Sequence, residues 1–283
     1  MFTLNRWKEN LPLKIVNVLV FAFLFGSNTY GSFTPHHTGR ETYFTPAAWV
    51  FNVWTIINFL LLCYVGYQFF DNSRTAVDAI GWRFTLIAVV NAIYASPAPS
   101  GRSCGSKERL PVHVWVTRHY IVAFIFSLLL ASVISTAYYS LTAHYGAQTI
   151  GDVLFVHLPF SLWHAWSIVL VFISGFALFT HSHRNHPSTI SVIFVVAAEA
   201  FLTLTAVGYA FRSREGDVAG SAVLFATLLG IYLEQHNNVI RYCALAGAII
   251  SGLAIVKSLY FTVVARERGV SLGSDDERRP LVA

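Results

Sequence analysis

One apolar stretch, residues 43–70, most limits what this chain can fold into. Pro46 suits the first turn of a helix, because the backbone amides there lack intrahelical partners in any case. The run from 47 to 70 can cross a bilayer core of roughly 30 Å at about 1.5 Å per residue. Trp49 and Trp54 lie near its start, as is typical of tryptophan at a membrane interface. We therefore predict a transmembrane helix here.

Further apolar runs recur along the whole chain. Of the 283 residues, 55% are hydrophobic and only 12% are charged, whereas soluble proteins average about 25% charged residues. The fold class that follows is all-α, a polytopic transmembrane bundle of about eight helices. We predict these helices at residues 11–30, 47–70, 81–95, 118–141, 151–179, 190–211, 218–234 and 239–264.

The first apolar run has two interpretations. A basic flank, a short apolar run and small residues after it also describe a secretory signal peptide. A membrane helix is favoured because so many helices follow. On this reading residues 1–10 form a cytosolic N-terminus, residues 11–264 the membrane domain, and residues 265–283 a disordered charged tail.

Residues 96–111 interrupt the third helix. This segment is rich in Ser, Gly, Pro and charge, and residues 112–116 after it are apolar again. It is either an insertion that divides one helix, for example from an unspliced intron, or an ordinary loop beside a short tilted helix.

The net charge of +5 reflects topology rather than a partner. Lysines and arginines are scattered over loops and ends, with no basic stripe that would follow the phosphates of a nucleic acid. More of them lie on the side that holds the two termini, so the positive-inside rule places both termini in the cytosol. The organelle stays open.

Two polar residues lie deep within predicted helices. A carboxylate at the bilayer centre costs several kcal/mol unless it is paired or hydrated, so Glu199 is a candidate site. His164 lies at a similar depth in the preceding helix, which predicts a hydrogen bond between His164 and Glu199. The alternative is a protonated Glu199 that binds a backbone carbonyl or a nearby Ser or Thr. Pro159 removes one backbone donor and predicts a kink.

No sequence motif indicates catalysis or a metal site. The loop histidines His181, His183 and His186 have no carboxylate or cysteine at a recognisable spacing. We therefore expect neither an enzyme nor a bound metal. Small residues every four positions predict close helix packing; they are Ala222, Ala226 and Gly230, and Ala244, Ala248 and Gly252.

Residues 45–54, TPAAWVFNVW, resemble the loop-to-helix segment of the TspO/MBR family, the tryptophan-rich sensory or translocator proteins. Residues 158–163, LPFSLW, are similar to the start of the family's last helix. The resemblance covers about residues 10–179. It departs from the family in three ways: Thr45 stands in place of the first of two prolines, the third helix is interrupted, and three helices follow the fifth.

The resemblance implies a ligand pocket beneath the first loop, for a tetrapyrrole such as haem or porphyrin, or for a sterol, in sensing or trafficking. With the polar residues above, the candidate ligand-binding residues are Pro46, Trp49, Trp54, Asn58, Pro159, Trp163, His164, Trp166 and Glu199. One alternative is that the tryptophans only anchor the helices. Another is a small proton-coupled transporter with a Glu/His site at the midplane. The expected partners are the lipid bilayer and a hydrophobic small molecule, with a homodimer left open.

Overall fold

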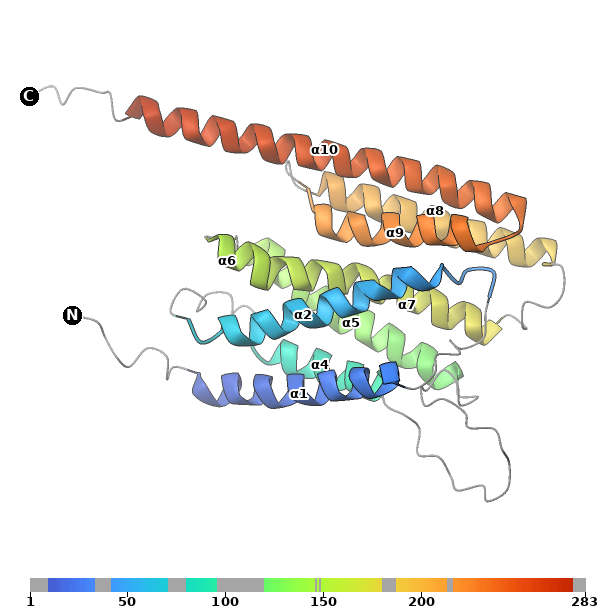
Figure 1. Ribbon diagram of the computed structural model, residues 1–283, viewed down its shortest axis with the longest axis horizontal. Coiled ribbons are helices and arrows are strands. Elements are labelled where there is room, and N and C mark those ends of the chain that lie inside the picture. The colour runs from blue at the N-terminus through green and yellow to red at the C-terminus, as the bar shows by residue number, and fades with distance from the viewer. Residues whose placement is uncertain are drawn as a thin grey trace, which may run out of the picture.

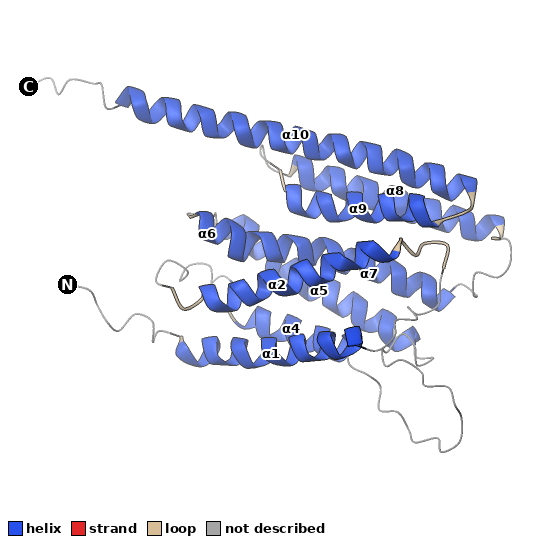
Figure 2. Ribbon diagram, in the orientation of Figure 1, coloured by secondary structure: helices blue, strands red, loops and turns tan. Residues whose placement is uncertain are grey.

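The computed structural model describes residues 10–33, 42–70, 80–95, 120–145, 147, 149–179, 187–212 and 216–276. Every regular element within these ranges is helical (Figure 2), as the apolar runs predict. The elements are α1 (Leu11–Phe33), the 3₁₀ turn η2 (Ala48–Phe51), α2 (Asn52–Tyr67), α4 (Trp82–Ala95), α5 (Tyr120–His144), α6 (Ile150–Asp152), the π-helical turn η4 (Val153–His157), α7 (Leu158–Phe179), α8 (Thr189–Phe211), α9 (Val218–Glu234) and α10 (Asn238–Asp276).

Among the described residues, six helical segments are long and apolar enough to cross a membrane. They are residues 11–28, 48–67, 120–144, 150–179, 189–211 and 238–262, while α4 and α9 are shorter apolar helices. The protein is therefore an integral, multi-pass membrane protein.

Successive long helices run in opposite directions through the bundle (Figure 1). The start of α1 and the end of α10 consequently lie at the same end, which we call the terminal end. The opposite end, where α2 begins, we call the loop end. Helices α8, α9 and α10 pack on one another, and α9 joins this group to α7.

Helix α7 lies at the centre of the bundle because it contacts α2, α5 and α9. Its indoles Trp163 and Trp166 are both fully buried. Trp54 packs edge-on against Trp163 with 6.3 Å between ring centroids, and Phe51 meets Trp166 in the same way at 5.7 Å. Aromatic pairs prefer this geometry, so the start of α2 is held on α7 by rings.

An irregular turn precedes Pro159 in the fifth span. Thr149 caps this span and exchanges hydrogen bonds with Asp152, after which residues 153–157 form a π-helical turn. Proline lacks the N–H that would bond the carbonyl four residues earlier, and its ring crowds that carbonyl. The structure has a π turn on the N-terminal side of the proline, at the place where a kink was predicted.

Helix α10 is longer than the sequence indicates, since it continues to Asp276. The prediction of a disordered tail from residue 265 is therefore wrong as far as Asp276. Residues 265–268 (Ala-Arg-Glu-Arg) are good helix formers, and no proline that would stop the helix occurs before Pro280. The segment 96–111 and residues 1–9 lie outside the described residues.

The small residues of α9 and α10 divide between two contacts. Ala244 and Ala248 are buried in the bundle, and a Cβ at Gly252 would lie 3.4 Å from the Phe225 ring of α9. Gly230 instead faces the first loop, because its carbonyl accepts the amide of Ala47 at 3.1 Å. The predicted close packing at small residues is thus confirmed, but Gly230 packs against the loop before α2 and not against another helix.

Candidate functional site in the cavity between α5, α7 and α8

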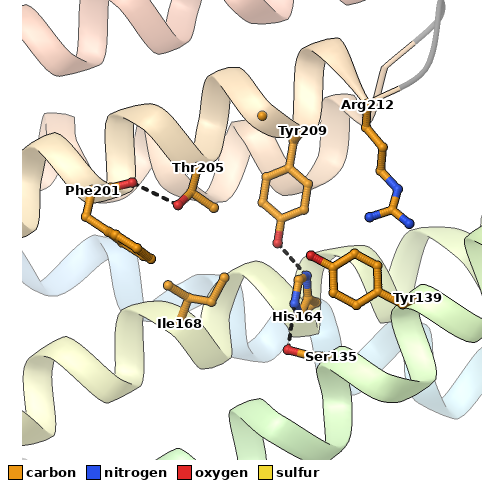
Figure 3. A pocket seen from close by; sticks show the side chains of 9 residues that line it. Ser135, Tyr139, His164, Ile168, Phe201, Thr205, Tyr209 and Arg212 are labelled. Atoms are coloured by element: carbon orange, nitrogen blue, oxygen red, sulfur yellow. Dashed lines mark hydrogen bonds between the residues drawn. The ribbon is translucent and has the colours of Figure 1, made fainter.

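His164 lies at the centre of a buried polar cluster near the terminal end. It projects from α7 and is 4% exposed. Its Nε2 is 2.9 Å from Oγ of Ser135 on α5, and its Nδ1 is 2.5 Å from the hydroxyl of Tyr209 on α8. The Tyr138 ring stacks on the imidazole at 4.4 Å, with 14° between the planes. Three helices therefore meet at this one ring (Figure 3).

The hydrogen bonds define which nitrogen of His164 carries the proton. The single hydroxyl hydrogen of Ser135 is donated to the carbonyl of Ala131 at 2.6 Å. Ser135 must therefore accept from Nε2–H, and Nδ1 of the neutral ring accepts from the Tyr209 hydroxyl. Both ring nitrogens are satisfied. The oxygen of Tyr209 keeps acceptor capacity for a further donor.

Asp217 connects the same helices from the turn before α9. Its carboxylate accepts hydrogen bonds from the hydroxyls of Tyr138, at 2.7 Å, and Ser161. The same side chain caps α9 by accepting the amide of Gly220 at 3.0 Å, and the Asp217 amide donates to the carbonyl of Tyr209 at 2.9 Å. Gly216 before it has φ of 72°, a conformation that favours glycine.

Arg212 lies where α8 ends, above the histidine cluster. Its guanidinium carbon is 4.4 Å from the ring centroid of Tyr139 and 5.3 Å from that of Tyr138. One nitrogen donates to Oγ1 of Thr142 at 2.9 Å. The exposed side chain is thus held over two aromatic rings of α5.

A cavity of about 480 Å³ lies beside this cluster. Helix α5 packs on α7, whereas α8 packs mainly on α9 and α10, and the cavity fills the space between α5, α7 and α8. Its size falls in the range of about 300–1,000 Å³ that is usual for small-molecule sites. The lining residues are Ser135, Tyr139, His164, Ile168, Phe201, Thr205, Gly208, Tyr209 and Arg212 (Figure 3).

Of the residues expected from the sequence, His164 alone lines this cavity. The others gather mainly at the α2–α7 contact. Pro46, Pro159, Trp163 and Trp166 are buried there or beside it, Trp54 is half-buried, and Trp49 is 43% exposed. Asn58 is engaged within the helices, since its amide donates to the Trp54 carbonyl at 2.7 Å and accepts from Asn28 at 3.1 Å.

The first loop packs against the end of α9. Gln235 donates to the carbonyl of Thr45 at 2.8 Å, and Pro46 and Val50 are the side chains that a Cβ at Gly230 would meet. Helix α9 therefore covers the loop beneath which the resemblance implies a ligand. Trp163 Nε1 is buried and has no hydrogen-bond partner among the described residues.

The predicted hydrogen bond between His164 and Glu199 is wrong. His164 binds Ser135 and Tyr209, and neither carboxylate oxygen of Glu199 has a hydrogen-bond partner among the described residues. The reason is the rotation of α8, which turns Glu199 toward Cys243 of α10 while Phe201 and Thr205 face the cavity. The alternative hydrogen bond, from a protonated Glu199 to a backbone carbonyl, Ser or Thr, is also absent among the described residues.

Several site residues were not found from the sequence. Ser135, Tyr138, Tyr139, Tyr209, Arg212 and Asp217 were read as parts of helices and of a charged turn. The available signal was a run of hydroxyl groups at the end of the fourth helix, which faces the end of the sixth if the helices alternate in direction. In the described residues no three His, Cys, Asp or Glu side chains are grouped as metal ligands, and His181, His183 and His186 lie outside them.

Comparison with known proteins gives one match. A family model described as "TSPO-like protein" matches residues 11–257. The chain belongs to the TSPO-like family. The match extends beyond the first five helices through α8 and α9 into α10, so the helices that complete the cavity are part of the family's own pattern. No curated protein and no solved structure matches the chain.

Proposed function

We propose that this TSPO-like membrane protein binds a flat hydrophobic ligand, such as a tetrapyrrole or a sterol, for sensing or trafficking, in the cavity between α5, α7 and α8. The observation that carries the proposal is the lining of that cavity. Phe201, Ile168 and Tyr139 supply apolar and aromatic surface, while His164 and Tyr209 supply a fixed polar group at the cavity wall. Apolar and aromatic walls combined with a few placed polar groups are usual in small-molecule sites.

The polar wall is suited to a ligand that carries a hydrogen-bond donor. The Tyr209 hydroxyl donates its hydrogen bond to Nδ1 of His164, so its oxygen can still accept a hydrogen bond from a ligand N–H or O–H. A pyrrole N–H and a sterol hydroxyl are both such donors. The walls of the cavity are preorganised, because the Asp217 and His164 hydrogen bonds hold α5, α7, α8 and α9 together before any ligand enters.

The proposed ligand site lies away from the first loop. Trp54 is engaged with Trp163, and Pro46 and Val50 lie against α9. These contacts support a packing role for the tryptophans at the start of α2. The proton-coupled transporter loses its main support, because Glu199 and His164 do not form a pair.

The charge distribution of the sequence also leads us to propose that the terminal end of the bundle faces the cytosol. Arg212 follows the last residue of α8, which ends at the terminal end of the bundle, and Lys257 donates to the Ala210 carbonyl in the last turn of that helix. The cavity would therefore be reached from the cytosolic leaflet. Reporter fusions at the C-terminus test this orientation. A fluorescent cytosolic reporter is expected, and activity of a reporter that matures only across the membrane would contradict it.

Titration with protoporphyrin IX in nanodiscs tests the proposed site. Gly208 lines the cavity, and a Cβ built there meets no atom within 4 Å, so Gly208→Phe fills the cavity without a backbone clash. The matched control is Gly66→Phe, at an equally open position on α2. Saturable binding is expected in the wild type and the control and is expected to be lost in Gly208→Phe. Equal binding by all three proteins would reject the cavity as the site.

A further inference from the structure

Arg212 supplies a fixed positive charge at the cavity. Among the described residues that line the cavity, no other side chain is a lysine or an arginine. Among the described residues its contacts are the Thr142 hydroxyl and the faces of Tyr138 and Tyr139, which are neutral groups. No carboxylate of the described residues forms an ion pair with it, although Asp217 lies only five positions along the chain.

The cation is held in place by its surroundings. Stacking on Tyr139 and the bond to Thr142 restrict the side chain, so less conformational freedom is lost when the guanidinium binds a ligand. Its five N–H groups form a planar fork that matches a carboxylate in a bidentate manner. In Figure 3 the exposed guanidinium lies at one end of the lining residues, while Ile168 and the 50% exposed Phe201 lie toward the other end.

We propose that the ligand of this cavity is an amphiphile that carries a carboxylate, which Arg212 binds at one end of the cavity while the apolar body lies against Phe201, Ile168 and Tyr139. This inference rests on the proposed function and adds the chemical class of the ligand. In Figure 3 the cation lies at one end of the cavity, the His164–Tyr209 pair in the middle, and the apolar side chains of Ile168 and Phe201 at the other end. This order matches a molecule with a carboxylate at one end and an N–H or O–H on an otherwise apolar body.

The test compares protoporphyrin IX with its dimethyl ester, which keeps the ring and removes both carboxylates. Both probes are titrated into nanodiscs of neutral phosphatidylcholine, with empty nanodiscs as blanks. The wild type is expected to bind the acid roughly tenfold more tightly than the ester, because charge-assisted hydrogen bonds are the stronger kind. Arg212→Gln is expected to remove this preference and leave the affinity for the ester unchanged, and Arg212→Lys to keep part of it.

The matched control is Arg241→Gln, because Arg241 also stacks on a tyrosine, with its guanidinium carbon 4.9 Å from the Tyr232 centroid, but on α10 outside the cavity. It is expected to keep the full preference for the acid. A thermal unfolding curve of each variant shows that it is folded. The preference should also persist in nanodiscs that contain phosphatidylglycerol. Its loss there would assign Arg212 to a lipid headgroup and overturn the proposal.

Two failures can be told apart. Equal binding of acid and ester by the wild type, or a preference that survives in Arg212→Gln, overturns the assignment of Arg212 and leaves the cavity as a ligand site. Binding of neither probe to the wild type overturns the proposed function, and this inference with it.

Discussion

The hydroxyl of Tyr209 donates a hydrogen bond of 2.5 Å to Nδ1 of His164. The two residues are 45 positions apart, on α8 and α7, and each is about 5% exposed or less. This bond links a helix that resembles the last one of the five-helix TspO/MBR core to the first of the three helices beyond it. The cavity lies beside that link and exists only because both groups of helices are present.

Removal of the Tyr209 hydroxyl is expected to destabilise the protein. Tyr209→Phe keeps the ring but leaves Nδ1 of a buried His164 without a donor, which costs about 1–3 kcal/mol. Thermal unfolding in detergent measures the effect as a lower Tm. Tyr242→Phe is the control, because Tyr242 is 61% exposed on α10 and should leave Tm unchanged. Equal Tm values for both variants would show that the bond contributes nothing.

Asp217 has two separable roles, and two substitutions distinguish them. Asn is as good an N-cap as Asp, so Asp217→Asn should keep the cap of α9 and weaken the bonds from Tyr138 and Ser161. Asp217→Ala loses both, including a cap worth about 1 kcal/mol. The expected order of Tm is wild type, then Asn, then Ala. A variant Asp217→Asn as unstable as Asp217→Ala would assign the whole effect to the carboxylate bonds.

Gly230 allows the first loop to approach α9. A Cβ there would meet the side chains of Val50 and Pro46, so Gly230→Ala is expected to cost about 1–3 kcal/mol through overpacking. Gly66→Ala meets nothing within 4 Å and should be neutral, or stabilising by up to about 1 kcal/mol through helix propensity. Unfolding measurements on the pair give the comparison. A stable Gly230→Ala protein would mean that the loop is not held against α9.

The two tryptophans at the start of α2 should differ in their effect on stability. Trp54 packs on Trp163, so Trp54→Ala is expected to cost about 3 kcal/mol. Trp49 is 43% exposed, so Trp49→Ala should cost well under 1 kcal/mol as an unfolding free energy. The opposite order would indicate that Trp49 is the packed residue and Trp54 is available to a ligand.

Most of the fold can be predicted from the apolar runs and from the polar, glycine and proline residues that separate them. Helix α9 was predicted at residues 218–234 and is observed as Val218–Glu234, because a charged turn with a glycine precedes it and a polar segment follows. The end of α10 was missed because a change from apolar to charged composition marks where a helix leaves the apolar core, not where the helix ends. Asp276 is still helical.

The site was harder to predict from the sequence than the fold, for a geometric reason. Residue counts give the depth of a side chain along each of two neighbouring helices. The similar depth of His164 and Glu199 led to the prediction of a hydrogen bond between them. Rotation about the helix axis cannot be obtained in that way. On α8 the residues Phe201, Thr205 and Gly208 face the cavity, while Glu199 and Thr203 are buried on another face near α10, where Thr203 lies beside Gly247. Which face turns inward is decided by the packing of α9 and α10.

Ligand protection of single cysteines tests most directly whether the cavity, and not the first loop, holds the ligand. In a protein with its native cysteines replaced by serine, Gly208→Cys places a thiol in the cavity and Ala48→Cys places one at the exposed start of η2. The rate of reaction with a methanethiosulfonate reagent is measured for each, with and without protoporphyrin IX. We predict that the porphyrin slows the reaction of the thiol at position 208 and leaves the reaction rate at position 48 unchanged. Protection at position 48 with none at position 208 would contradict it.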